Sequence, residues 1–182
     1  MEPLSIVNES IIPALNSVGV KFEKGIVFLP QLIASAETVQ KSFAIIKEAL
    51  MKNNKEEVVK GKIILATVEG DIHDIGKNIV KVILESYGFK VIDLGKNVPA
   101  EEVLRVAREQ EITLVGLSAL MTTTVKSMEK TIMLIRESGL NIKVMVGGAV
   151  LTEEYAKSIS ADFYAKDAME SVKIAENHFL AK

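Results

Sequence analysis

The residues with the clearest chemical potential lie in the segment Glu69–Asn78, where one histidine stands among carboxylates. His73 follows Asp71 by two residues and directly precedes Asp74. The segment comes after an apolar run, Lys62–Val68, that predicts a β-strand, and a helical pattern follows it. Loops that lead from a strand into a helix are where parallel α/β sheets place their ligands. We therefore expect His73 to meet a ligand.

An isolated histidine suits some chemistries better than others. A zinc site needs three or four protein ligands, and the only other histidine, His178, lies near the far end of the sequence. Histidine-dependent nucleophile triads need a serine partner, and no segment resembles a nucleophile elbow. A metal in a tetrapyrrole-like macrocycle needs only one axial imidazole, since the ring fills four positions. Asp71 can then orient His73 by accepting a hydrogen bond from its other ring nitrogen. A histidine that merely caps or hydrogen-bonds remains the alternative.

Small residues and hydroxyls also follow two other predicted strands. Ser118–Thr124 comes after the third strand and Gly147–Ala149 after the fourth. Alone, Gly147-Gly148 would suit an ordinary tight turn, and Ser118 a helix entry. On consecutive strand ends they instead predict a slot lined by glycine, alanine and serine, in which a long, narrow group lies beside the backbone.

The elements that must position these loops alternate along the chain from about residue 62 onward. The predicted strands are Lys62–Val68, Lys90–Leu94, Thr113–Leu117, Lys143–Val146 and Asp162–Ala165. The predicted helices are Lys77–Tyr87, Ala100–Glu109, Val125–Ser138, Glu153–Ser158 and Ala168–Phe179. This alternation is the signature of successive βαβ units. We predict the α/β class, with a flavodoxin-like doubly wound, five-stranded parallel sheet in the order 2-1-3-4-5.

The first 50 or so residues show helical spacing without strands. Pro13 sits inside the first apolar stripe, so that helix is kinked or starts later than the stripe implies. Pro30 suits the first turn of a second helix. The polar segment Met51–Gly61 reads as a linker. We therefore predict two domains, a short helical cap over residues 1–55 and the sheet domain over residues 61–182.

Composition excludes several classes of function. The 182 residues carry a net charge of -2, so no basic stripe invites nucleic acid. The absence of cysteine rules out disulfides, thiolate metal sites and a cysteine nucleophile, and it suits a reducing cytoplasm. No apolar run approaches the roughly 18 residues of a membrane span, and the first twenty residues lack a signal-peptide pattern. We expect a soluble cytoplasmic protein.

The three motifs together resemble a known signature. Asp71-x-His73-x-x-Gly76, then Ser118-x-Leu120, then Gly147-Gly148 is similar to the cobalamin-binding domains of methionine synthase, corrinoid methyl-carrier proteins and some mutases. The resemblance covers essentially the whole chain. It implies that His73 replaces the cofactor's own benzimidazole as the lower cobalt ligand and that Asp71 is its hydrogen-bond partner. Thr124 stands where the methionine synthases have a serine that completes this relay.

The resemblance also implies a set of cofactor contacts drawn from all three loops and the last strand. These residues are Asp71, His73, Asp74, Ile75, Gly76, Ser118, Leu120, Thr122, Thr124, Gly147, Gly148, Ala149 and Tyr164. Gly76 would leave room for the displaced nucleotide tail of the cofactor, and Ser118, Leu120 and the two glycines would line its tunnel.

The N-terminal segment resembles the helical cap that precedes this domain in methyl-transferring members. There, side chains matching Phe22 and Leu29 cover the upper face of the corrin, although ordinary bundle core is the alternative for both residues. The family bundle has four helices, and this sequence begins roughly two helices in. We therefore expect either a truncated chain or partners, including further copies, that complete the bundle.

The function implied by the resemblance is methyl transfer with cobalamin, as methylcobalamin or a related corrinoid, bound base-off and histidine-on. Such a carrier works with donor-side and acceptor-side methyltransferases and a reductive activator, and is not expected to catalyse alone. A radical-mutase subunit and a cobalamin-dependent sensor are the alternatives. The mutase normally works with a large barrel, and the sensor needs a DNA-reading module, and the sequence shows a pattern for neither. A phosphorelay receiver requires an aspartate at the end of the third strand, where Leu117 and Ser118 stand.

Overall fold

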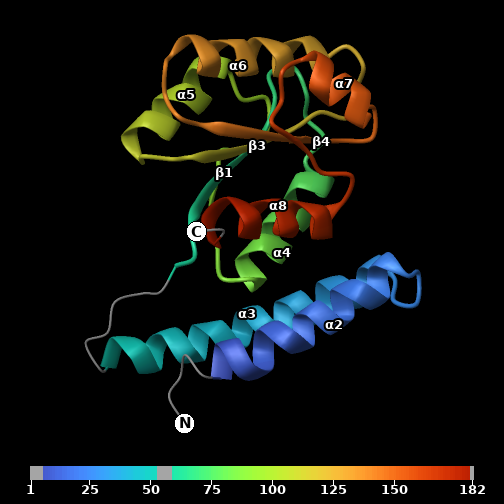
Figure 1. Cartoon of the computed structure of the whole chain (residues 1–182), viewed down its shortest axis with the longest axis vertical. Coiled ribbons are helices and arrows are strands. Elements are labelled where there is room, and N and C mark those ends of the chain that lie inside the picture. Colours follow the sequence, from blue (N-terminus) through green and yellow to red (C-terminus); the bar gives the residue numbers. More distant parts are fainter. Residues whose placement is uncertain (1–5, 53–58, 181–182) are drawn as a thin grey trace.

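The computed structural model describes residues 6–52 and 59–180, which form one parallel sheet with helices on both of its faces and a helical pair beyond one of them (Figure 1). The strands are β1 Lys62–Thr67, β2 Lys90–Asp93, β3 Leu114–Ser118, β4 Lys143–Gly147 and β5 Phe163–Tyr164. The helices of the sheet domain are α4 Ile75–Ser86, α5 Ala100–Glu109, α6 Val125–Glu137, α7 Glu153–Ser158 and α8 Ala168–Leu180. Before them come the π-helical turn η1 Val7–Ile11 and the helices α2 Ile12–Glu23 and α3 Leu29–Lys52.

The strand order is β2-β1-β3-β4-β5 and every pairing is parallel, which confirms the predicted fold. In the register, Thr67 of β1 lies beside Ser118 of β3, and Ser118 lies beside Gly147 of β4. Three adjacent strands therefore end at one level, and their loops leave the same edge of the sheet. The chain reverses its direction across the sheet between β1 and β3, which is the point where open α/β sheets bind ligands.

The strands alternate their side chains between two hydrophobic cores. On one face Ile64, Val115 and Val144 pack with helices α5, α6 and α7. On the other face Ile63, Leu65 and Met145 pack with helices α4 and α8. Central strands buried on both faces read as nearly continuous apolar runs, which is why β1, Lys-Ile-Ile-Leu-Ala-Thr, could be predicted from sequence.

The helices α2 and α3 form a cap that packs on α4 and α8 (Figure 1). Leu15, Leu32 and Ala36 are buried against this second core. Gly19 permits the contact, since a Cβ atom there would lie 2.4 Å from Cε of Met169 on α8. Pro13 falls in the first turn of α2, and the five residues before α2 form the π-helical turn η1. Helical structure therefore extends back along the apolar stripe, with a change from π-helical to α-helical geometry next to Pro13. Leu4, the first residue of that stripe, lies outside the described residues.

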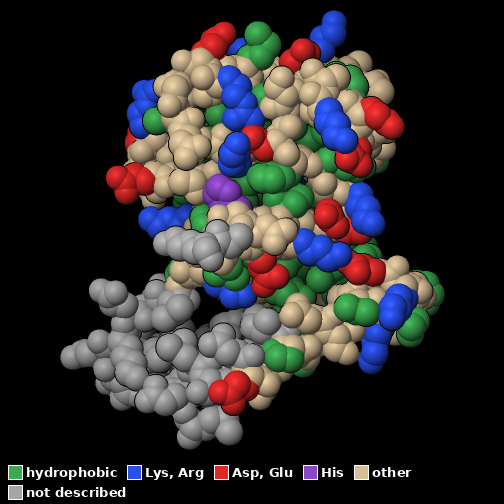
Figure 2. All heavy atoms as spheres, in the orientation of Figure 1, with side chains coloured by type: hydrophobic (Ala, Val, Ile, Leu, Met, Phe, Trp, Pro, Cys, Tyr) green, Lys and Arg blue, Asp and Glu red, His purple; other side chains and the backbone are tan. Residues whose placement is uncertain are grey.

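Two surface properties bear on the kind of ligand. Basic and acidic side chains are interspersed over the face shown in Figure 2, in keeping with the net charge of -2. Among the described residues, no helix has the length and apolar character needed to cross a bilayer.

Candidate cofactor site

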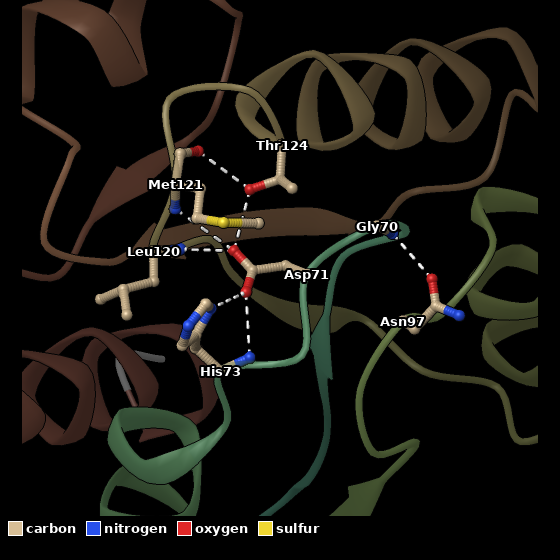
Figure 3. A network of polar contacts seen from close by, with 7 residues as sticks. All are labelled: Gly70, Asp71, His73, Asn97, Leu120, Met121 and Thr124. Atoms are coloured by element: carbon tan, nitrogen blue, oxygen red, sulfur yellow. Dashed lines mark hydrogen bonds and ion pairs between the residues drawn. The ribbon is translucent and has the colours of Figure 1, made fainter.

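Asp71 is the centre of a polar network that joins two of the loops at this edge (Figure 3). The backbone N–H and the ring Nδ1 of His73 lie 3.0 and 2.8 Å from its Oδ1 atom. The backbone N–H groups of Leu120 and Met121 donate to its Oδ2 atom over 2.7 and 3.3 Å. The Thr124 hydroxyl lies 2.8 Å from the same Oδ2 atom and 2.9 Å from the carbonyl oxygen of Met121. The β1–α4 loop is thus fastened to the β3–α6 loop through one carboxylate.

This environment keeps Asp71 ionised. The Asp71 side chain is fully buried, and burial alone would raise its pKa. The backbone hydrogen bonds from His73 and Leu120, with those from the His73 ring and the Thr124 hydroxyl, outweigh that effect and hold the pKa of Asp71 well below its usual range. Thr124 precedes α6 without capping it through its side chain, which leaves the hydroxyl free for Asp71.

The ionised carboxylate determines the tautomer of His73. A carboxylate can only accept hydrogen bonds, so the Nδ1 atom that lies 2.8 Å from Asp71 carries the proton. The lone pair of the neutral ring is then on Nε2, the atom available to a ligand or a proton. The His73 side chain is 45% exposed, whereas that of Asp71 is 0% exposed. The pair therefore presents an oriented base backed by a buried carboxylate.

Apolar side chains surround the exposed imidazole. Ile72 is 61% exposed, Ile75 is 78% exposed and Leu120 is 41% exposed. All three line the same cavity as His73. Isoleucine side chains so open to solvent next to an oriented histidine provide a surface on which a flat, partly apolar ring can lie.

A cavity of about 700 Å³ extends from His73 along the ends of β1, β3 and β4, on the face covered by α4 and α8. Gly76, in the first turn of α4, has no atom within 4 Å of the position its Cβ would take, so the absence of a side chain there leaves open space. Gly116 of β3 also lines the cavity, and a Cβ atom on it would lie 2.5 Å from Leu65. The cavity can take a long group alongside the strands.

Gly148 allows the β3 and β4 loops to approach each other. Its φ of +145° lies in a region that side chains rarely adopt, and a Cβ atom there would be 1.8 Å from the carbonyl oxygen of Ala119. The neighbouring Gly147 accepts a hydrogen bond from the Ala119 N–H at 3.2 Å. Glycine at position 148 is thus required by the backbone, and it brings the third motif into the wall of the cavity.

Most of the residues predicted for the site lie together. The predicted residues that line the cavity are His73, Asp74, Ile75, Gly76, Ser118, Leu120, Gly147, Gly148, Ala149 and Tyr164. Asp71 and Thr124 lie behind His73 and support it. The Tyr164 hydroxyl donates to the carbonyl oxygen of Leu151 at 3.0 Å, so its ring is fixed.

Three predicted contacts lie elsewhere. Thr122 is exposed in the β3–α6 loop and does not line the cavity. Phe22 packs against the core under α4 and α8, and Leu29 is exposed at the start of α3. Neither cap residue lines the cavity.

The cavity also has walls that motif matching did not find. They include Leu65 and Met145 from strand interiors, Lys77 and Val80 from α4, and Ala165–Ala168 with Ser171 around the start of α8. Strand alternation could have supplied the first two, since they share the face of Gly116. Lys77 carried no such signal, because a lysine in a first helical turn is usually solvated. Here it is buried, and its Nζ donates to Asp93 over 2.6 Å.

Two family profiles match this chain. A family profile described as "B12 binding domain" matches residues 61–173, and a second profile with the same description matches residues 1–47. The chain belongs to the B12-binding domain family, which confirms the resemblance drawn from the three motifs. It is 42% identical over 184 residues to dimethylamine corrinoid protein 2 of Methanosarcina acetivorans, covering 100% of this chain and 85% of that protein.

Two solved structures are similar over nearly all of the chain. The methanol:cobalamin methyltransferase complex MtaBC from Methanosarcina barkeri matches with a TM-score of 0.85 and 29% identity, covering 100% of this chain and 69% of that one. The monomethylamine corrinoid protein of Methanosarcina barkeri matches with a TM-score of 0.61 and 34% identity, covering 96% and 83% of the two chains.

Proposed function

We propose that this chain binds a corrinoid with the cofactor's own base displaced and His73 as the lower axial ligand, and carries a methyl group between methyltransferase partners. The observation that carries the proposal is the His73 imidazole, with its Nδ1 proton held by buried Asp71 and its Nε2 free beside a deep cavity. A corrinoid held there would supply the cobalt that carries a methyl group from a donor to an acceptor.

Different residues of the site have different roles in this proposed function. Asp71 orients the imidazole and raises the basicity of Nε2 toward the metal. Ile72, Ile75 and Leu120 contact the lower face of the flat ring. The cavity that opens at Gly76 would take the displaced nucleotide tail, and a second set of lining residues would contact that tail. That set is Asp74, Ser118, Gly147, Gly148, Ala149 and Tyr164. The same Asp71 carboxylate would stabilise a positive charge on the His73 ring, because it lies 2.8 Å from Nδ1.

The opposite face of the cofactor is assigned in this proposal to the cap, through Phe22 and Leu29. Neither residue lines the cavity with the cap packed as it is on α4 and α8. Contact with a bound ring therefore requires the cap to shift on those two helices. Thr122, exposed at the rim, is a contact for a peripheral group of the ring.

The relatives support methyltransferase partners for this chain. Because the chain is 42% identical to a dimethylamine corrinoid protein, we assign the methyl donor to the methylated amines. We further propose that the chain works with a donor-side methyltransferase, an acceptor-side methyltransferase and a reductive activator. We also propose that it associates with further copies through the cap and that it is cytoplasmic. The donor assignment is tested by mixing the methylated amine, its methyltransferase and this chain with its corrinoid bound, and measuring methylation of the corrinoid. Methanol with its own methyltransferase is the comparison, since MtaBC is a more distant relative at 29% identity.

The axial ligand is tested with His73→Ala, and the chain offers a matched control in His178→Ala. His178 lies on α8 and contacts Thr113, away from the cavity. We expect hydroxocobalamin bound to the wild type and to His178→Ala to give one visible spectrum, and His73→Ala, folded by circular dichroism, to give another. A sharper readout is electron paramagnetic resonance of the Co(II) form. Labelling the histidines with ¹⁵N should turn the splitting of each line by the axial nitrogen from a triplet into a doublet. If neither the His73→Ala substitution nor the ¹⁵N labelling changes the spectrum, His73 is not the axial ligand.

A further inference from the structure

Asn97 lies in the loop between β2 and α5, outside all three motifs, yet it contacts the loop that carries His73 at two points. Its side-chain Oδ1 accepts a hydrogen bond from the backbone N–H of Gly70 at 2.7 Å (Figure 3). Its own backbone N–H donates to the carbonyl oxygen of Asp71 at 2.9 Å. One residue therefore binds on both sides of the Gly70–Asp71 peptide unit.

The same loop is fastened to the end of β1 as well. The Val98 N–H donates to the carbonyl oxygen of Thr67 at 3.0 Å, and Val68 and Val98 form an isolated parallel bridge. These bonds extend the β1–β2 pairing beyond the strands, up to the point where the chain turns toward Asp71. The backbone bonds of Val98 would persist with any residue at position 97. The bond to Gly70, in contrast, depends on the side chain of Asn97.

Gly70 is the part of the loop that most needs this support. Its φ of +85° is accessible to glycine at little cost, and glycine has the largest range of alternative conformations. A rotation at Gly70 would move the α-carbon of Asp71, whose carboxylate is held on the other side by the β3–α6 loop. Asn97 itself has a φ of +54°, a conformation that asparagine tolerates better than most residues.

We infer that Asn97 is a positioning residue for the axial ligand: by fixing Gly70 and Asp71 it sets how well the Asp71–His73 pair is placed to coordinate the metal. The inference rests on the proposed function, since it concerns the same histidine. Residues that orient a metal ligand directly are typically worth 10- to 100-fold in metal affinity. Asn97 acts one step further back and is exposed, so we expect roughly a 3- to 10-fold loss in the histidine-on equilibrium when its side chain is removed.

The test uses the full chain and three variants. Asn97→Gly keeps the left-handed backbone and its N–H but removes the acceptor for Gly70. Asn97→Asp keeps an oxygen acceptor in the same place and should restore the contact. Glu111→Gly is the matched control, because Glu111 also has a φ of +54° and lies before β3, at the opposite edge of the sheet from the cavity.

Two measurements separate positioning from mere structural support. In the protein without cofactor, amide exchange of Gly70 should be faster in Asn97→Gly than in the wild type and in Asn97→Asp. With hydroxocobalamin as the probe, the visible spectrum should show a 3- to 10-fold lower ratio of histidine-on to histidine-off cofactor in Asn97→Gly. Asn97→Asp and Glu111→Gly should stay within about twofold of the wild type.

The possible failures are distinguishable. If the wild type shows no histidine-on spectrum at all, the proposed function fails, and the inference falls with it. If the wild type shows that spectrum and folded Asn97→Gly gives the same ratio, only the inference about Asn97 is wrong. An equal change in Glu111→Gly would also overturn it, because the effect would then belong to glycine substitution in general.

Discussion

Replacing Asp71 by asparagine should change both the stability of the fold and the proton on His73. The carboxylate receives hydrogen bonds from His73, Leu120, Met121 and Thr124 at 2.7 to 3.3 Å. An amide of the same shape has one oxygen to accept some of these bonds, while its NH₂ group must face other donors. With the oxygen toward Leu120 and Thr124, the NH₂ group faces the backbone N–H of His73, and that N–H loses its acceptor.

The expected loss follows from these contacts. One buried donor left without a partner costs about 1–3 kcal/mol, and bonds that lose a charged acceptor weaken by about 1 kcal/mol in total. We therefore expect the free energy of unfolding of Asp71→Asn to be about 3 kcal/mol lower than that of the wild type at pH 7. The amide also favours the other tautomer, because Nδ1 can accept from NH₂ only if the proton moves to Nε2. That proton removes the lone pair needed by a metal.

The pH dependence identifies the carboxylate as the cause. A group whose pKa is lower in the folded state than its ordinary value of 3.8 stabilises the fold above that value. The stabilisation is lost as the pH falls toward the lower folded-state pKa, because the unfolded state binds the proton first. Below about pH 4.5 the wild type should lose the contribution of Asp71, which Asp71→Asn does not have, so the difference in unfolding free energy between them shrinks. Contributions from Asp93 and Asp162, whose pKa values are also lowered, are present in both proteins and cancel.

The assay is urea unfolding of the cofactor-free proteins at several pH values between 7 and 3, with the ¹⁵N shifts of the His73 ring reporting the tautomer. A difference in unfolding free energy that stays constant over this range would refute the assignment of Asp71 as a buried, ionised acceptor. A ring that keeps its proton on Nδ1 in Asp71→Asn would refute the link between the carboxylate and the free Nε2.

Two further substitutions test other parts of the site. Thr124→Val removes the hydroxyl bonded to Asp71, so it should lower the free energy of unfolding by about 1–2 kcal/mol and raise the pKa of Asp71. Thr124→Ser keeps the hydroxyl and should stay close to the wild type. Urea unfolding measures the first effect, and a ¹³C carboxyl titration by NMR measures the second. Gly76→Leu places a side chain in open space inside the cavity and improves helix propensity by up to about 1 kcal/mol. It should therefore abolish hydroxocobalamin binding, measured by equilibrium dialysis, without loss of thermal stability, and a destabilised Gly76→Leu would show that the space is not free.

The sequence could predict the sheet well because its signals are local. Strands buried on both faces are short apolar runs, and their alternation with helical patterns determines the βαβ class. The helices α5, Ala100–Glu109, and α7, Glu153–Ser158, were predicted with their observed bounds, and the other elements of the sheet domain differ by one or two residues at one or both ends. Only β5 is clearly shorter than predicted: Asp162 uses its carboxylate to bind Val144 N–H, Arg136 and Lys143 at the other edge of the sheet.

The contacts between loops could not be predicted in the same way. That Asp71 would meet Thr124 followed from resemblance, because a 53-residue separation leaves no periodic signal. The bond from the Leu120 N–H to Asp71 was not predicted. Asn97 carried no signal at all, since an asparagine before Val-Pro reads as an ordinary turn. The helical spacing of the first 50 residues predicted helices there, but it could not say that Leu32 and Ala36 pack against α4 and α8.

The desolvation cost of burying the ionised carboxylate of Asp71 is the strongest physical reason to regard this loop as functional. A buried carboxylate whose partner ring is neutral gains little from charge pairing, and replacing a buried polar group together with its partners by apolar packing is often neutral or stabilising. The fold instead commits three backbone N–H groups and a hydroxyl to keeping the group ionised. Ordinary packing does not require an ionised acceptor at this point. An imidazole whose proton must stay on Nδ1, so that Nε2 keeps its lone pair, does require one.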